Sequence, residues 1–325
     1  MWTPSSPAPA RFPRRFARAL AALPCDGFGV RRAPHAEADD GLVAATPQGL
    51  AADLHELLLD PAVDLVLCAA GGYTTVRVLP HLDFGLIRAC GKPIVGYSDV
   101  TSLLWAVLSR ANTVTFHGPM VVSEWGEVGG ANPYTTARFR DVISPWTGPV
   151  RLTAPERWTD ELLVWDKEDV RPRRTHPGMW RALIPGVAQG WLLPGCAPTA
   201  GRLFGTPWMP CADGAILCLE TLYMGPEEFL GLLLQWRLSG QLERINGLVI
   251  GRHCRPLADS DDSSAFDRVV LEALGRDDIP VLVDVDFGHT EPRLTLPVGV
   301  ACRLDAFSLS ITIVEEPVTS GGTSS

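Results

Sequence analysis

The sequence predicts an α/β protein in which helices cover the faces of a parallel sheet, arranged as two halves around an irregular middle. Three observations carry this prediction. Segments with helical spacing of apolar residues alternate with short apolar runs typical of buried strands. The chain has 325 residues, 46% of them hydrophobic, which is enough for two domains with substantial cores. The stretch between the halves is rich in tryptophan, proline and arginine and has no sustained period.

In the first half, spacing and flanking residues indicate each element. Phe12, Phe16, Leu20 and Leu23 lie on one helical face, and short apolar runs before glycine or proline have the length of buried strands. The expected elements are helices at 13–23, 47–59 and 100–110, strands at 63–69, 93–97 and 114–117, and a glycine turn at 71–73. Strands that alternate with helices in this way favour a parallel sheet.

The remainder divides into a middle segment, a second half and a tail. We expect connector and loop at 144–194, strands at 214–219, 247–251, 281–286 and 300–304, and helices at 226–238 and 264–274. Small and polar residues predict a disordered tail. The predicted division is a first domain at 1–145, a connector with a long loop at 146–194, a second domain at 195–316 and a tail at 317–325.

Composition limits the partners that this chain can bind. The formal net charge of −9 argues against a general nucleic-acid or anionic-membrane binder, because both need basic faces, and it favours a small-molecule or peptide substrate. Eight cysteines without a C-x-x-C pair predict free thiols and a reducing cytoplasm. The apolar stretch that ends at Pro24 is too short for a secretion leader, and no run approaches the roughly 18 apolar residues of a membrane span.

Ser98 stands where an apolar strand stops and a helical pattern begins. This strand–turn–helix pattern would place the hydroxyl at the carboxyl end of a strand, facing the unpaired N–H groups of the helix start. A nucleophilic serine is presented in this way. Serine is also among the best helix caps, and Asp99 suits a first helical turn, so capping is the alternative interpretation.

Two other strands end in titratable side chains. Glu220 closes the apolar run 215–219, and His289 follows the run 281–287 and Gly288. Ligands collect at the carboxyl ends of parallel strands, so Ser98, Glu220 and His289 form a plausible nucleophile, orienting carboxylate and base. Each has a structural alternative: Glu220 as a solvated or capping carboxylate, and His289 as a ligand of its own turn. His117 competes for the role of base.

Other chemistries lack their motifs. Residues 71–74 do not match G-x-G-x-x-G, no Walker-type Gly-Lys-Ser or Gly-Lys-Thr is present, and no histidine pair has the H-E-x-x-H spacing.

The same residues resemble the family of LD-carboxypeptidases and microcin C self-immunity serine peptidases. The resemblance covers nearly the whole chain, from Ser5 to about Leu304, and the joint order of its landmarks is highly specific. The landmarks are Gly71-Gly72-Tyr73 with Arg77, Gly96-Tyr97-Ser98-Asp99, Phe116-His117-Gly118-Pro119, Leu219-Glu220, Arg244-Ile245-Asn246-Gly247-Leu248, and Gly288-His289-Thr290 with Pro292.

This resemblance implies a Ser-Glu-His peptidase. Ser98 is then the nucleophile, His289 the general base and then acid, and Glu220 the residue that holds the imidazole, with the backbone N–H groups of Gly72 and Asp99 as the oxyanion hole. The implied fold is a Rossmann-like N-terminal domain with a parallel sheet and a smaller, strand-rich C-terminal domain, with the active site between them. Homodimers are common in the family, and the mechanism requires no metal or organic cofactor.

The implied substrates are of two kinds. Family members cut either the L,D-peptide bond before the terminal D-alanine of muropeptides or the amide of microcin C-like aminoacyl nucleotides. Residues 158–161 and 179–181 resemble the long loop of the microcin-type members, which implies that Trp180 stacks on a nucleobase; the alternative is that Trp180 only packs this loop.

The chain also departs from the family pattern. Only four residues precede Ser5, so the first sheet strand is expected to be missing or truncated. Residues 74–76 and 195–199 differ from the usual family segments, which affects the local loop and the domain junction. We keep two rival functions. One is an inactive family member that only binds a peptide or nucleotide-like ligand, which the missing strand permits. The other is a class I glutamine-amidotransferase-like hydrolase. The second is disfavoured because that class uses a cysteine nucleophile.

Overall fold

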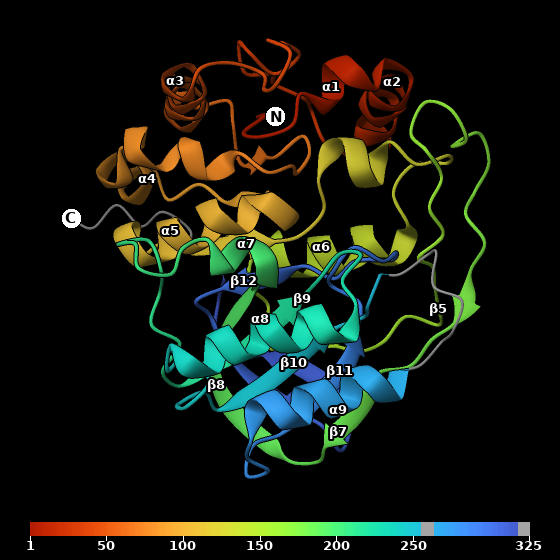
Figure 1. Cartoon of the computed structure of the whole chain (residues 1–325). Helices are drawn as coiled ribbons and strands as arrows, with labels where there is room; N and C mark the ends of the chain where they lie inside the picture. The colour runs from red at the N-terminus through yellow and green to blue at the C-terminus, as the bar shows by residue number, and fades with distance from the viewer. Residues whose placement is uncertain (255–262, 318–325) are drawn as a thin grey trace.

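Two main sheets organise the chain, and the computed structural model describes them over residues 1–254 and 263–317. Figure 1 shows the red-to-yellow N-terminal half at one end of the molecule and the green-to-blue C-terminal half at the other. Of the tail expected at 317–325, residues 318–325 lie outside this description. Within the described ranges, none of the helices combines the length and the apolar character needed to cross a bilayer.

The N-terminal sheet has four strands, in the order β1, β2, β3, β12. The first three strands are parallel, as predicted, and β12 pairs antiparallel with β3. The strands are β1 (Val66–Leu67), β2 (Ile94–Gly96), β3 (Thr115–His117) and β12 (Leu296–Val298). The helices of this half are α1 (Ala8–Arg11), α2 (Pro13–Ala22), α3 (Pro47–Leu59), α4 (Phe84–Cys90), α5 (Thr101–Ala111) and α6 (Pro133–Ile143). The helices expected at 13–23, 47–59 and 100–110 are confirmed as α2, α3 and α5.

The expected truncation of the first strand takes a specific form. Trp2 makes a single parallel bridge with Cys68, next to β1. The Trp2 backbone N–H donates to the Leu67 carbonyl at 3.1 Å, and the Trp2 backbone carbonyl accepts from the Ala69 N–H at 2.7 Å. The indole is fully buried. One residue therefore stands at this edge of the sheet in place of the full first strand of the family pattern, as the sequence predicted.

The C-terminal sheet has eight strands, in the order β4, β14, β13, β8, β9, β10, β11, β7. Its four central strands, β8 to β11, are parallel, and antiparallel strands flank them on both sides. Helices α8 and α9 lie side by side on this sheet (Figure 1). The strands are β4 (Val150–Leu152), β7 (Arg181–Ile184), β8 (Val187–Cys196), β9 (Ala215–Glu220), β10 (Gly247–Gly251), β11 (Val281–Val285), β13 (Ala301–Asp305) and β14 (Ser310–Ile313). The helices are α7 (Ala197–Gly201), α8 (Pro226–Leu238) and α9 (Ser263–Leu274).

The sequence predicted connector and loop for the segment 146–194, but the segment also contains strands. It supplies β4, β7 and most of β8 to the C-terminal sheet, and the short ribbon of β5 (Arg157–Trp158) and β6 (His176–Pro177). The prediction was wrong here because glycine and proline interrupt β8, and because β4 is an edge strand whose partner, β14, lies far away in the sequence.

The two halves are packed directly on one another. Trp105 of α5 and Trp236 of α8 are both fully buried, and their rings meet edge to face with centroids 5.7 Å apart. The Trp105 indole N–H also donates to the Pro194 carbonyl at 2.8 Å. The aromatic contact holds α8, and the hydrogen bond holds the end of β8, against the helix that begins beside Ser98.

Candidate active site

Ser98 lies in a sharp turn between β2 and α5. The strand ends at Gly96, a short 3₁₀ turn η4 (Ser98–Val100) follows, and α5 begins at Thr101. Ser98 has φ +60°, a conformation that few non-glycine residues adopt and that is associated with functional sites. The N-cap residue of the turn is Tyr97, so the capping interpretation of Ser98 does not describe its position.

The structure brings together the three side chains predicted from the sequence. The Ser98 Oγ lies 2.9 Å from His289 Nε2, and His289 Nδ1 lies 2.7 Å from Glu220 Oε2. Glu220 is the last residue of β9, and His289 follows β11 in the same sheet, whereas Ser98 follows β2 in the other sheet. The Glu220 side chain is fully buried, and that of His289 is 11% exposed. Hydrogen bonds therefore join the three residues across the junction of the halves.

Two glycines make room for Glu220. A Cβ at Gly251 would lie 2.6 Å from the Glu220 Cβ, and one at Gly288 would lie 2.8 Å from Glu220 Oε2. Neither approach leaves space for a side chain. The role of Gly251 was not predicted from the sequence, because only the pairing of β10 with β9 brings it beside the carboxylate.

His117, the competing candidate for the base, has another environment. It is fully buried, and its Nε2 lies 3.0 Å from the Phe287 carbonyl oxygen. Burial lowers the pKa of His117 to about 4, because the charged imidazolium would lose its hydration. The structure thus makes His117 a neutral core residue beneath the loop that carries His289.

The glycine turn at 71–72 lies against the serine. A Cβ at Gly71 would stand 2.9 Å from the Ser98 Cβ and 3.6 Å from the Asp99 nitrogen. Gly72 has φ +152°, and a Cβ there would lie 2.4 Å from Ser5 Oγ. Both positions therefore require glycine, and the backbone of Gly71 packs directly against Ser98.

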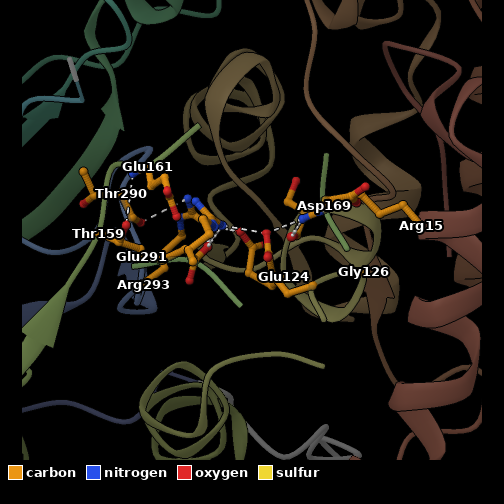
Figure 2. A network of polar contacts seen from close by, with 12 residues as sticks. Arg15, Glu124, Gly126, Thr159, Glu161, Asp169, Thr290, Glu291 and Arg293 are labelled. Carbon is orange, nitrogen blue, oxygen red and sulfur yellow. Dashed lines mark hydrogen bonds and ion pairs between the residues drawn. The ribbon is translucent and has the colours of Figure 1, made fainter. Parts of the chain in front are cut away.

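A buried ionic network supports the histidine loop, and Figure 2 shows Arg293 at its centre between Glu124 and Glu291. The Arg293 Nε donates to the Gly288 carbonyl at 2.7 Å, and its guanidinium lies 3.6 Å from the centroid of the Tyr97 ring. The Tyr97 ring in turn meets the His289 ring edge to face, with centroids 5.2 Å apart. Arg293 thereby connects the residue before Ser98 with the residue before His289.

The long loop of the middle segment, residues 159–175, is anchored at two points. Thr159 pairs with Glu291 through two backbone hydrogen bonds, of 2.7 and 2.9 Å (Figure 2). Asp166 accepts the backbone N–H groups of Arg14 and Arg15 at 2.8 and 2.7 Å, so it caps α2 from a distant part of the chain. Sequence reasoning missed these contacts because nothing in a loop's composition shows which helix it will cover.

A cavity of about 470 Å³ opens beside Ser98 and His289. Its apolar lining includes Phe12 and the loop residues 162–165, and the Arg15 guanidinium lies over the Trp165 ring, 4.5 Å from its centroid. Its charged lining includes residues of the ionic network, among them Arg173, Glu291 and Arg293. Burial raises the pKa of the Glu291 carboxyl. The cavity can therefore accept a ligand with both an apolar and a polar part.

The tryptophan prediction requires a correction. Trp180 is only 1% exposed, its indole N–H donates to Asp286 Oδ2 at 2.9 Å, and it does not line the cavity. Its ring is core, in agreement with the alternative interpretation. Trp165, which the sequence did not single out, lines the cavity and lies against Phe12, with ring centroids 5.1 Å apart. The two tryptophans share an irregular segment, where no periodicity shows which one faces a ligand.

Comparison with known proteins gives matches in both halves of the chain. Residues 1–118 match the model of the LD-carboxypeptidase N-terminal domain, and residues 189–304 match that of the C-terminal domain. A Streptomyces coelicolor protein named as a carboxypeptidase is 34% identical over 284 residues, which cover 86% of this chain and 81% of that protein. The microcin C7 self-immunity protein MccF of Escherichia coli is 29% identical over 316 residues, 96% of this chain and 91% of that protein.

A solved structure of MccF in complex with aspartyl sulfamoyl adenosine superposes on this chain with a TM-score of 0.91 at 28% identity. It covers 98% of this chain and 96% of the other. The sequence expectation of a Rossmann-like first domain and a strand-rich second domain is confirmed. On these grounds, the chain belongs to the LD-carboxypeptidase family, whose members are serine carboxypeptidase-like hydrolases.

Proposed function

We propose that this protein hydrolyses an amide bond with Ser98 as nucleophile, His289 as general base and acid, and Glu220 as the residue that orients the imidazole. One observation carries the proposal: the hydrogen-bonded line from Ser98 Oγ through both ring nitrogens of His289 to Glu220 Oε2, at 2.9 and 2.7 Å. These distances are those expected of a nucleophile, its base and the group that orients the base.

In the proposed reaction, Ser98 Oγ attacks the amide carbonyl carbon while its proton passes to His289 Nε2. The buried Glu220 carboxylate stabilises the imidazolium that forms. The backbone N–H groups of Gly72 and Asp99 stabilise the negative oxygen of the tetrahedral intermediate. His289 then protonates the leaving amine, an acyl-enzyme remains on Ser98, and a water molecule activated by His289 hydrolyses it.

Two substrate classes fit the cavity. An aminoacyl nucleotide amide is favoured by Trp165 in the cavity lining, on which a base could stack. A muropeptide with a terminal D-alanine is favoured by Arg173 in the same lining, since a guanidinium is suited to carboxylate recognition. The neighbouring MccF structure holds a ligand of the first kind, aspartyl sulfamoyl adenosine.

The test compares the wild-type protein with Ser98→Ala on muramyl tetrapeptide and on aspartyl sulfamoyl adenosine, with products measured by mass spectrometry. Ser109→Ala is the matched control, because Ser109 lies on α5 and its hydroxyl donates to the Trp105 and Trp208 carbonyls, away from the triad. We expect cleavage of at least one substrate by the wild type and the control, and none by Ser98→Ala. Cleavage that persists in Ser98→Ala would exclude Ser98 as the nucleophile.

A fluorophosphonate probe separates this proposal from the rival of an inactive binding protein. The proposal expects labelling at Ser98 in the wild type and its loss in Ser98→Ala. A folded protein that binds a substrate but is never labelled would favour the binding protein. We further propose a cytoplasmic homodimer, which the family resemblance implies; all eight cysteines are free, and light scattering would measure the oligomeric state.

A further inference from the structure

The side chain of Asp99 extends from the serine turn to the glycine turn. Asp99 follows Ser98 directly and is fully buried. Its Oδ2 accepts the Thr75 N–H at 2.7 Å and the Ser5 hydroxyl at 2.7 Å. Its Oδ1 accepts from Arg202 Nη1 at 3.0 Å. One carboxylate therefore receives three donors, which compensates the loss of hydration on burial.

These donors follow the glycine turn in the chain or lie next to it. Thr75 begins the short 3₁₀ turn η2 (Thr75–Arg77) after the glycine turn, and Ser5 Oγ also accepts the Thr74 N–H at 3.2 Å. Ser6 N–H donates to the Gly71 carbonyl at 3.1 Å, on the other side of Gly72. The backbone around Gly72 is thus held from both ends, in contact with Ser5.

Arg202 adds a link to the C-terminal half. It follows α7, and its Nη1 lies 3.3 Å from the Tyr73 carbonyl oxygen while it also bonds to Asp99. Its guanidinium carbon lies 5.7 Å from the centroid of the Tyr73 ring. Arg202 is 37% exposed, so its ion pair with Asp99 contributes little to the stability of the fold. Its role is to hold Asp99 and the Tyr73 carbonyl in position.

We propose that the Asp99 carboxylate, assisted by Ser5 and Arg202, is a positioning group that sets the distance between the two oxyanion donors. The backbone N–H of Asp99 is one donor, and the side chain of the same residue fixes the turn that carries the other, the N–H of Gly72. A single residue then determines the spacing of both. This inference rests on the proposed function, because it concerns the same oxyanion hole.

The consequence is an effect on kcat without an equal effect on binding. Oxyanion donors act on the charge that develops in the transition state, so their displacement weakens catalysis more than ground-state affinity. Removal of one donor typically costs about 10²–10³ in kcat. A displaced but present Gly72 N–H should cost less, and we expect a fall of about 10- to 100-fold in Asp99→Asn.

The test uses Asp99→Asn in the full chain. The new asparagine side chain has two orientations. In one, its NH₂ group faces the Arg202 guanidinium; in the other, it faces the Thr75 N–H and the Ser5 hydroxyl. In both, a donor meets a donor. Asp53→Asn is the matched control, because Asp53 is equally a buried carboxylate that accepts a backbone N–H, that of His35 at 3.1 Å, away from the cavity. Removal of Arg202 in the Asp99→Asn background should restore part of kcat, because the amide oxygen can then turn to Thr75.

Three measurements decide the matter: kcat on the cleaved substrate, the thermal midpoint, and substrate affinity in the Ser98→Ala background. The inference expects the fall in kcat, affinity within about threefold, and a thermal shift no larger than that of Asp53→Asn. A kcat within threefold of wild type, or an equal loss in affinity and kcat, would overturn it. If Asp99→Asn does not fold, Ser5→Ala is measured, and an unchanged kcat there would overturn the inference too.

The failure of this inference can be distinguished from the failure of the proposed function. If Ser98 is not the nucleophile, the wild type is not labelled by fluorophosphonate or Ser98→Ala still cleaves. If only the inference is wrong, the wild type is labelled and cleaves, and Asp99→Asn does so at nearly the same rate.

Discussion

Replacement of Glu220 by glutamine gives the sharpest test of the proposed chemistry, because it changes one atom in a fully buried side chain. At present Glu220 Oε2 lies 2.7 Å from His289 Nδ1, which favours a proton on Nδ1 and leaves Nε2 free to accept from Ser98. A glutamine amide that directs its N–H₂ to Nδ1 would favour the other tautomer, whose Nε2–H cannot accept the serine proton.

We expect Glu220→Gln to lower kcat by about 10³- to 10⁴-fold, or about 4–5.5 kcal/mol, the range associated with the wrong tautomer of a triad histidine. The assay is kcat and KM on the substrate that the wild type cleaves, with circular dichroism to verify folding. Glu227→Gln, in the exposed first turn of α8, is the control and should keep its activity. A Glu220→Gln variant that folds and retains more than a tenth of kcat would refute this reasoning.

Three further predictions concern the surroundings of the triad. Gly72→Ala should lower kcat by about 10²-fold or more, because its Cβ would lie 2.4 Å from Ser5 Oγ; a normal kcat would remove Gly72 from the oxyanion hole. Trp165→Ala should raise KM for aspartyl sulfamoyl adenosine about tenfold, whereas Trp180→Ala should destabilise the fold by about 3–5 kcal/mol in urea titrations; the reverse pattern would contradict the burial. Burial lowers the pKa of His117 from 6.5 to about 4, so the contribution of neutral His117 to the free energy of unfolding is present above pH 6.5 and lost as the pH falls toward 4. Between pH 7 and pH 4 the free energy of unfolding of the wild type should therefore fall by about 3 kcal/mol more than that of His117→Gln, measured in urea titrations. An equal fall in the two proteins would contradict a neutral buried His117.

Much of the candidate site could be predicted because its residues lie at the ends of readable strands. Ser98 follows β2, Glu220 ends β9, and the apolar runs that form these strands stop abruptly in the sequence. Side chains can converge at the carboxyl ends of parallel strands, so the sequence supported the hypothesis that Ser98, Glu220 and His289 form one catalytic triad. The family resemblance implied the same three roles and added the backbone N–H groups of Gly72 and Asp99 as the oxyanion hole.

The remainder depended on contacts between distant segments. No local pattern shows that Asp166 caps α2, that Gly251 must be small to admit Glu220, or that Arg293 lies over Tyr97. Loop side chains such as Trp165 lack the periodicity that reveals a buried face. These features follow from tertiary packing, and a single sequence gives no measure of it.

The strand β12 has a consequence for how the protein is made. It comes from residues 296–298, yet it completes the sheet of the first half by pairing with β3 at residues 115–117. During synthesis from the N-terminus, the backbone groups of β3 on that side stay without their partner strand until residues 296–298 have emerged. The nascent first half is therefore exposed to pairing with other chains while about 180 further residues are made, and we expect chaperone dependence to be greatest in that interval.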